Sequence, residues 1–236
     1  MEQGKLYIVA TPIGNLKDIT YRAIEVLKAV DVIGVEDTRH SGPLLKHYRI
    51  DTPTISFFEH NEQKRTEEFL EKLANGQSIA IISDAGTPAI SDPGYRLISE
   101  AVNNNFTVVP LPGASSVLTA LVGSGFPTDR FVFEGFLPKK KGRQTRLLEW
   151  QKEKRTIIFF ESPHRIIKTL EDCRDYLGNR ELAIGREMTK MYEEFHRGTA
   201  AELLEYFQQE KPRGEFVVVI KNEKKKKVKV NKYAKK

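Results

Sequence analysis

Short apolar runs alternate with amphipathic segments along the first half of the chain. Five runs rich in β-branched residues predict strands buried on both faces of a sheet: residues 6–10, 32–36, 54–57, 79–83 and 107–111. Between them, apolar residues recur at helical spacing and predict helices over residues 21–30, 43–48, 66–74 and 95–103. Such alternation is typical of a mostly parallel sheet with helices on both faces.

The second half of the chain shows the same alternation of predicted strands and helices after a break. A helix of small residues, 114–123, ends at Gly123 and Gly125, and we interpret it as the join between two domains. Strands are predicted over residues 131–135, 156–161, 182–186 and 216–220, and helices over residues 144–150, 163–177 and 200–208. In the helix 163–177, Ser162 is expected as the N-cap and Pro163 as the first helical residue.

Residues 188–196 alternate loosely in polarity, so some strand pairing in the second half is expected to be antiparallel. The predicted fold class is α/β, with two α/β domains. The N-terminal domain (residues 1–112) should hold a mostly parallel sheet, and the C-terminal domain (residues 113–223) a mixed sheet. Residues 224–236 form a basic tail that is expected to be disordered.

Composition narrows the class of protein. The single cysteine, Cys173, excludes a disulfide framework and a zinc site built on cysteines, and we expect no metal. One cysteine fits the reducing cytoplasm. The chain starts without a charged leader and an apolar stretch, and nowhere do eighteen apolar residues follow one another. We therefore expect a cytoplasmic protein that is neither secreted nor membrane-spanning.

The net charge of +6 is unevenly distributed, because the tail 224–236 holds eight lysines and no acid. Such a tail is suited to contact with a polyanion or simply keeps the chain soluble, and both interpretations stay open. A second basic segment covers residues 139–146. Its lysines and arginines favour a mobile loop that binds RNA phosphates, with a solvated loop as the alternative. The candidate RNA-binding residues are Lys139, Lys140, Lys141, Arg143 and Arg146.

The segment 83–94, SDAGTPAISDPG, contains the pattern Ser-Asp-x-Gly twice and follows a predicted buried strand. Gly86 and Gly94 allow positive φ, while Asp84 and Asp92 can bind loop amides or a ligand hydroxyl. Open α/β sheets bind ligands at the carboxyl ends of their strands, so the segment is predicted to be a ligand loop. The alternative is a connecting loop built on Asx turns.

Other predicted strands also end in chemistry-bearing residues. Asp37 can hold a ribose or act as a base, and Arg39 can clamp a phosphate, with a helix cap and an ion pair as the alternative. Met188 can pack against an adenine or belong to the core, and Lys190 with Glu187 or Glu193 can move a proton. The Gly-x-Gly-x-x-Gly, Walker A and His-Glu-x-x-His patterns are absent, which leaves dehydrogenase, ATPase and zinc peptidase activities without support.

Seven segments together resemble the tetrapyrrole methylase superfamily: VATPIGNLKDIT, VEDTRHSGPLL, SDAGTPAISDPG, PLPGASS, FFESPHR, GREMTKMYEE and RGEF. Members use S-adenosylmethionine in a cleft between two α/β domains and are usually homodimers. Within the superfamily the chain resembles the branch that methylates the ribose 2′-oxygen of a cytidine in small-subunit ribosomal RNA. Ser83-Asp84-Ala85 replaces the Gly-Asp-Pro of the tetrapyrrole branch, which argues against a tetrapyrrole substrate.

The resemblance implies a set of cofactor-binding residues and a partner, free small-subunit ribosomal RNA or the assembled small subunit. The cofactor-binding residues are Pro12, Ile13, Asp84, Gly86, Thr87, Ser115, Ser116, Phe160, Met188, Gly214 and Glu215. Transfer of a methyl group to a ribose hydroxyl also requires a base and groups that orient the RNA. The candidates for the base are Asp37, Glu187, Lys190 and Glu193, with Arg39 and Arg186 as clamps.

Two alternatives remain open at this point. One is a methylase of the same fold that acts on a tetrapyrrole or a protein side chain. The other is a non-enzymatic factor that binds RNA during assembly. Binding of S-adenosylmethionine separates the second from the enzymes, because a binding factor has no use for a methyl donor.

Overall fold

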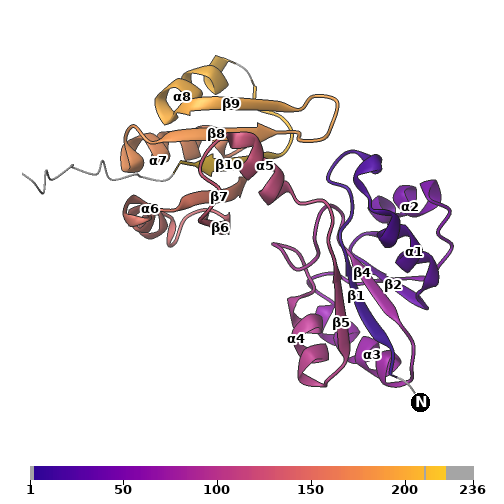
Figure 1. Ribbon diagram of the computed structural model, residues 1–236. Coiled ribbons are helices and arrows are strands. Elements are labelled where there is room, and N and C mark those ends of the chain that lie inside the picture. Colours follow the sequence, from indigo (N-terminus) through magenta and orange to yellow (C-terminus); the bar gives the residue numbers. More distant parts are fainter. Residues whose placement is uncertain (1–2, 210, 222–236) are drawn as a thin grey trace, which may run out of the picture. The chain divides into compact units, whose positions relative to one another are not determined.

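The computed structural model describes residues 3–209 and 211–221, which form two compact units (Figure 1). The first unit holds the residues up to Thr119 together with Glu187–Glu193. The second holds Ala120–Arg186 and the residues from Glu194 onward. The units thus divide at Thr119 rather than between residues 112 and 113, and one loop from the second half of the chain joins the first unit. The predicted tail, residues 224–236, lies outside the described residues.

The first unit contains a five-stranded sheet in the order β3-β2-β4-β1-β5, and all four of its strand pairs are parallel. The strands are β1 (Lys5–Val9), β2 (Val32–Val35), β3 (Thr54–Ser56), β4 (Ile79–Ile82) and β5 (Thr107–Leu111). The helices are η1 (Leu16–Asp18), α1 (Tyr21–Ala29), α2 (Thr38–His47), α3 (Glu62–Ala74) and α4 (Tyr95–Asn103). The prediction of a parallel sheet is confirmed.

Alternate side chains of the central strand β4 build two cores, one on each face of this sheet. Ile79 and Ile81 pack with α3 and α4, whereas Ala80 and Ile82 pack with α1 and α2 (Figure 1). All four side chains are almost completely buried. Because successive side chains of a strand point to opposite faces, a continuous apolar run fits a strand covered on both sides.

The second unit contains a mixed sheet in the order β6-β7-β10-β8-β9. β6 (Phe131–Phe136) is parallel to β7 (Thr156–Glu161), while β10 (Phe216–Ile220) is antiparallel to β7 and β8 (Glu181–Arg186), and β9 (Glu194–Thr199) is antiparallel to β8. Three helices, α6 (Arg143–Lys152), α7 (Ile166–Leu177) and α8 (Ala200–Gln209), share one core with the strands. The predicted mixed sheet is confirmed. The helix α5 (Ser116–Ser124) contains the point at which the units divide.

Three helices, α2, α3 and α7, begin three or more residues away from their predicted starts. α2 starts at Thr38 rather than residue 43, because Asp37 caps its first turn, and Pro43 lies inside the helix. α3 starts at Glu62, four residues earlier than predicted, through a polar first turn without helical periodicity.

The expected cap of α7 is wrong. The helix begins at Ile166 with Arg165 at the N-cap, and residues 163–165 form a turn. The Ser162 carbonyl accepts hydrogen bonds from the amides of Arg165 and Ile166, at 3.0 and 3.1 Å. Ser162 therefore closes the turn through its backbone and not through a capping side chain.

Among the described residues, no helix is both long and apolar enough to cross a membrane.

Candidate functional site

The carboxyl ends of the parallel strands in the first unit meet at one edge of its sheet, where open α/β folds bind ligands. The loops after β1 and β4 are joined there by a backbone bridge between Thr11 and Gly86. Each amide donates to the other residue's carbonyl, at 2.9 and 3.0 Å. The Thr11 hydroxyl also donates to the Ser83 carbonyl, at 3.1 Å. The two predicted ligand loops are thus held side by side.

The loop 83–94 has an unusual backbone. Gly86 and Gly94 have φ of +80° and +132°, as the doubled Ser-Asp-x-Gly pattern led us to expect. Ala89 and Ser91 also have positive φ, +68° and +65°, without being glycines. Each such residue costs about 1–3 kcal/mol and persists only where the surroundings enforce it. The loop that the sequence marks as a ligand loop therefore has a strained backbone at Ala89 and Ser91.

Asp37 and Arg39 form the cap with an ion pair that was one of the two interpretations. The Asp37 carboxylate accepts from the Arg39 amide at 2.8 Å and pairs with the Arg39 guanidinium, at 2.6 Å to Oδ2. These hydrogen bonds lower the pKa of Asp37 to about 2. A carboxylate with so low a pKa is a weak proton acceptor at neutral pH.

Asp84 connects the loop after β2 with the loop after β4. Its carboxylate accepts from the Asp37 amide at 3.2 Å and lies 2.8 Å from Nδ1 of His40. The hydrogen bond and the charge of Asp84 raise the pKa of His40. Asp84 is therefore both a predicted cofactor residue and the link between two strand-end loops.

Three carboxyl groups gather at this edge: Glu36, Asp84 and Asp92. Burial, followed by the charge of Glu36, raises the pKa of Asp92 to about 6, while a hydrogen bond from Ser83 acts in the opposite direction. Burial and the charge of Asp84 likewise raise the pKa of Glu36. The cluster is thus short of positive charge, and a cationic ligand would complement it. Among the described residues, no set of three metal-ligating side chains is placed to hold a metal ion.

Replacing Asp92 with asparagine should stabilise the protein at pH 7.5. The pKa of Asp92 is about 6 in the folded chain against 3.8 as the ordinary value, so between these values the folded state binds more protons than the unfolded state. Its contribution to stability is present below about pH 4 and is lost as the pH rises through about 6. The asparagine side chain does not titrate, so the free energy of unfolding, measured with denaturant at pH 5, 6 and 7.5, should fall less steeply in the variant. Asp51→Asn, an exposed aspartate of the same unit, is the control, and equal slopes in both variants would contradict the prediction.

The loop Glu187–Glu193 belongs to the first unit and packs against the loop after β1. A Cβ on Gly14 would lie 2.8 Å from Oγ1 of Thr189 and 3.2 Å from the Met188 carbonyl, so only glycine fits there without movement. Within the loop, Lys190 pairs with Glu187 at 3.0 Å, and the Glu193 carboxylate accepts from the Thr189 amide at 2.5 Å. Met188 is buried. The three predicted acid–base residues of this loop thus also shape it.

Eight of the predicted cofactor-binding residues lie in the first unit: Pro12, Ile13, Asp84, Gly86, Thr87, Ser115, Ser116 and Met188. Thr87 Oγ1 donates to the Ala114 carbonyl at 3.4 Å, which links the loop after β4 to the loop after β5. Ser115 Oγ accepts from the Leu118 amide at 3.4 Å, at the start of α5. The structure therefore brings these residues together as neighbours of one sheet edge.

The other three, Phe160, Gly214 and Glu215, lie in the second unit. Val217 of β10 pairs with Phe160 of β7, so the turn before β10 adjoins the carboxyl end of β7. Gly214 has φ of +86°, which favours glycine at this turn. Arg186 ends β8 at the same edge, donates to the Arg213 carbonyl at 2.8 Å and pairs with Glu194 at 3.0 Å. The second unit thus gathers its share of the predicted residues at one edge of its own sheet.

The basic segment 139–146 divides into exposed and anchoring residues. Lys139, Lys140 and Lys141 are exposed. Arg143 is only 12% exposed at its side chain, pairs with Asp172 at 2.7 Å and donates to Thr169 at 2.9 Å. Arg146 pairs with Glu134 at 2.8 Å. Because its guanidinium is held by these internal partners, Arg143 anchors the start of α6, and it differs in this from the three exposed lysines with which the sequence groups it.

Known proteins resemble this chain in sequence over most of its length. The profile of the tetrapyrrole (corrin/porphyrin) methylases matches residues 5–204. A protein of Synechocystis called ribosomal RNA small subunit methyltransferase I is 52% identical over 219 residues, which cover 92% of this chain and 78% of that protein. A protein of the same name from Thermotoga maritima is 50% identical over 217 residues, 92% of this chain and 98% of its own length.

Solved structures share the fold at low sequence identity. A diphthine synthase superposes with a TM-score of 0.72 at 14% identity, covering 92% of this chain and 90% of that chain. A cobalt precorrin-4 methyltransferase superposes with a TM-score of 0.69 at 17% identity, covering 92% and 94%. The predicted fold class is confirmed by these structures.

Proposed function

We propose that this chain, which belongs to the tetrapyrrole (corrin/porphyrin) methylase family, is a methyltransferase that acts on small-subunit ribosomal RNA. One observation carries the proposal: the relatives named ribosomal RNA small subunit methyltransferase I are about half identical to this chain over more than nine tenths of its length. The same fold also serves a precorrin methyltransferase and a diphthine synthase, so the fold alone does not select the substrate.

The methyl donor in this proposal is S-adenosylmethionine, which supplies an electrophilic methyl group on a sulfonium. The residues of the first unit fit such a ligand. Its sulfonium and ammonium charges complement the carboxylates around Asp84, and the absence of a side chain at Gly86 lets a ligand approach the backbone. Hydroxyl groups of Thr87 and Ser115 and the buried Met188 complete the set in that unit. Phe160, Gly214 and Glu215 are the proposed contribution of the second unit.

The acceptor in this proposal is the ribose 2′-oxygen of a cytidine, and the chain must remove its proton. A proton acceptor works best when its pKa is near the working pH, which favours Asp92, at about 6, over Asp37, at about 2. The sequence-based candidates Glu187, Lys190 and Glu193 remain alternatives. Arg39 is the proposed phosphate clamp, and its side chain is 86% exposed although it is paired with Asp37.

The direct test uses labelled S-adenosylmethionine and small ribosomal subunits from cells that lack the enzyme. We expect label in the ribose of one cytidine and none in uroporphyrinogen or a protein side chain. Absence of S-adenosylmethionine binding by calorimetry would select the non-enzymatic alternative. Label in a tetrapyrrole or a protein would select the other branches of the fold.

Contact with RNA is proposed for Lys139, Lys140 and Lys141 together with the lysine-rich residues 224–236. Deleting residues 224–236 should flatten the salt dependence of rRNA binding, because each phosphate contact contributes about 0.7–0.9 to the slope of log K against log salt. Binding at about 50 to 300 mM salt, the range over which such slopes are resolved, measures it. A truncated chain with the slope of the full chain would make the tail a solubilising terminus.

We also propose that the protein forms a homodimer and acts in the cytoplasm, where its rRNA substrate is. Leu118 and Val122, four residues apart on α5, are 52% and 74% exposed. Apolar side chains on one helix face favour contact with a second copy. Light scattering of the purified protein measures the oligomeric state.

A further inference from the structure

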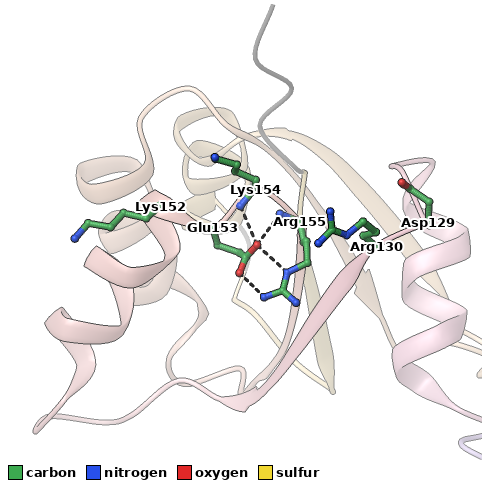
Figure 2. A pocket seen from close by; sticks show the side chains of 6 residues that line it. All are labelled: Asp129, Arg130, Lys152, Glu153, Lys154 and Arg155. Carbon is green, nitrogen blue, oxygen red and sulfur yellow. Dashed lines mark hydrogen bonds and ion pairs between the residues drawn. The ribbon is translucent and has the colours of Figure 1, made fainter.

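A polar hollow lies in the second unit, at the amino ends of β6 and β7 (Figure 2). Its volume is about 630 Å³. The residues before β6 contribute Asp129 and Arg130, the end of α6 contributes Lys152, and the loop between α6 and β7 contributes Glu153, Lys154 and Arg155. Every lining residue is charged, and cations outnumber carboxylates by two to one. No sequence pattern pointed to this place.

The one carboxylate within the α6–β7 loop is fully engaged. Glu153 accepts from the amides of Lys154 and Arg155, both at 2.8 Å, and pairs with the Arg155 guanidinium at 2.7 Å (Figure 2). These bonds lower the pKa of Glu153 to about 2, so it stays ionised and bound to Arg155. Arg130, Lys152 and Lys154 are exposed, and none forms an ion pair with a carboxylate in the described chain. Three cations are therefore available to an anion.

Hydrogen bonds hold the backbone of the segments that line the hollow. The buried Arg180 donates to the Trp150 carbonyl at 2.9 Å and to the Lys221 carbonyl at 2.8 Å, so it ties the end of α6 to the end of β10. The Thr156 amide donates to the Arg130 carbonyl at 3.2 Å. A site whose backbone is held in this way loses little freedom when it binds a ligand.

The hollow and the predicted cofactor-binding residue Phe160 lie at opposite ends of β7. Phe160 is near the carboxyl end of this six-residue strand, so about 15–20 Å separate the two ends. The helix α6 runs between them, with Lys139, Lys140 and Lys141 before its start and Lys152 at its end. The described chain also leaves the second unit here, since Ile220 pairs with Ile157, and eight lysines follow in residues 224–236.

We infer that this hollow is a second phosphate-binding site for the RNA substrate, at the end of β7 opposite to Phe160. The inference rests on the proposed function, because it takes the RNA as given and assigns a part of its path. An open hollow lined only by charged side chains suits a sugar–phosphate backbone, whereas small-molecule pockets are mostly apolar. The spacing of roughly 15–20 Å along β7 corresponds to several nucleotides of extended backbone. The site therefore supplies affinity and orientation, and no chemistry.

The test is the double variant Arg130→Gln and Lys154→Gln, measured with a full-length transcript of small-subunit rRNA and with small ribosomal subunits. Loss of two phosphate contacts should lower the slope of log K against log salt by about 1.5 and weaken binding roughly tenfold at about 100 mM salt. S-adenosylmethionine affinity and kcat at saturating rRNA should stay unchanged. The control, Lys28→Gln with Lys64→Gln, removes the same charge from exposed lysines of α1 and α3.

The outcomes separate this inference from the proposed function. If the wild-type protein methylates rRNA and the double variant has the control's salt slope and affinity, the hollow is not an RNA site and only the inference falls. If the double variant loses kcat at saturating rRNA, the hollow acts in the reaction and the inference is wrong as stated. A wild-type protein that neither binds nor methylates rRNA overturns both.

Discussion

Replacing Gly14 with valine should weaken S-adenosylmethionine binding and lower the rate of methyl transfer by about 100-fold. Any Cβ at residue 14 would lie 2.8 Å from Oγ1 of Thr189 and 3.2 Å from the Met188 carbonyl. The loop Glu187–Glu193 cannot yield cheaply, because Glu187 and Thr189 already have positive φ, +49° and +67°. We therefore expect the branched side chain to displace Met188 and Lys190, and a displacement of about 1 Å at a reacting site costs about 100-fold in rate.

Gly42→Ala is the matched control, since a Cβ at Gly42 would meet no atom within 4 Å. Calorimetry gives the affinity for S-adenosylmethionine, and denaturant unfolding shows whether Gly14→Val folds. If it does not, Gly14→Ala applies the smaller displacement, and its loss of affinity should exceed that of Gly42→Ala. A folded Gly14 variant with wild-type affinity and turnover would remove the loop Glu187–Glu193 from the proposed site.

The sequence predicts best those elements whose signal is local. β7 and β10 have the predicted bounds, because a strand buried among neighbours is a continuous apolar run bounded by polar residues. The starts of α2 and α3 were missed for the opposite reason. Their first turns are polar, and in α2 the Asp37 side chain holds that turn, which periodicity does not record.

The residues of the candidate site likewise fall into those that topology groups together and those whose partners are far away in the sequence. Loops that follow parallel strands must share an edge, so the grouping of Thr11, Asp37 and Asp84 followed from topology alone. Pairing between side chains far apart in the sequence did not follow from topology. Arg143 looked like part of a lysine loop, yet its partner Asp172 is 29 residues away in the next helix. The raised pKa of Asp92 likewise depends on long-range features, first on its burial and then on the charge of Glu36, which follows a different strand.

Two substitutions at the carboxyl edge of the first sheet should separate proton transfer from positioning. Asp92→Asn should lower kcat by about 10²- to 10⁴-fold, the usual contribution of a general base, while leaving S-adenosylmethionine binding measurable. The wild-type kcat/KM for S-adenosylmethionine should fall about tenfold per pH unit below about pH 6, because Asp92 of the free enzyme is then protonated and cannot accept a proton, and this acid limb should be absent from the residual activity of the variant. The same variant is expected to be more stable at pH 7.5, and a gain of stability with a loss of activity is typical of a functional group kept in an unfavourable environment.

Asp37→Ala should act differently, although it removes a carboxylate from the same edge. It frees the Arg39 guanidinium and the α2 amide that Asp37 holds, so we expect a higher KM for rRNA, a lower stability and an acid limb that stays near pH 6. The kcat/KM for S-adenosylmethionine at saturating rRNA, measured from pH 5 to 8, distinguishes the two roles. A wild-type kcat/KM that is flat over this range, together with activity abolished by Asp37→Ala, would identify Asp37 as the base, since a group with a pKa of about 2 is already ionised throughout. Asp92 would then be left with a purely electrostatic role beside the proposed cationic cofactor.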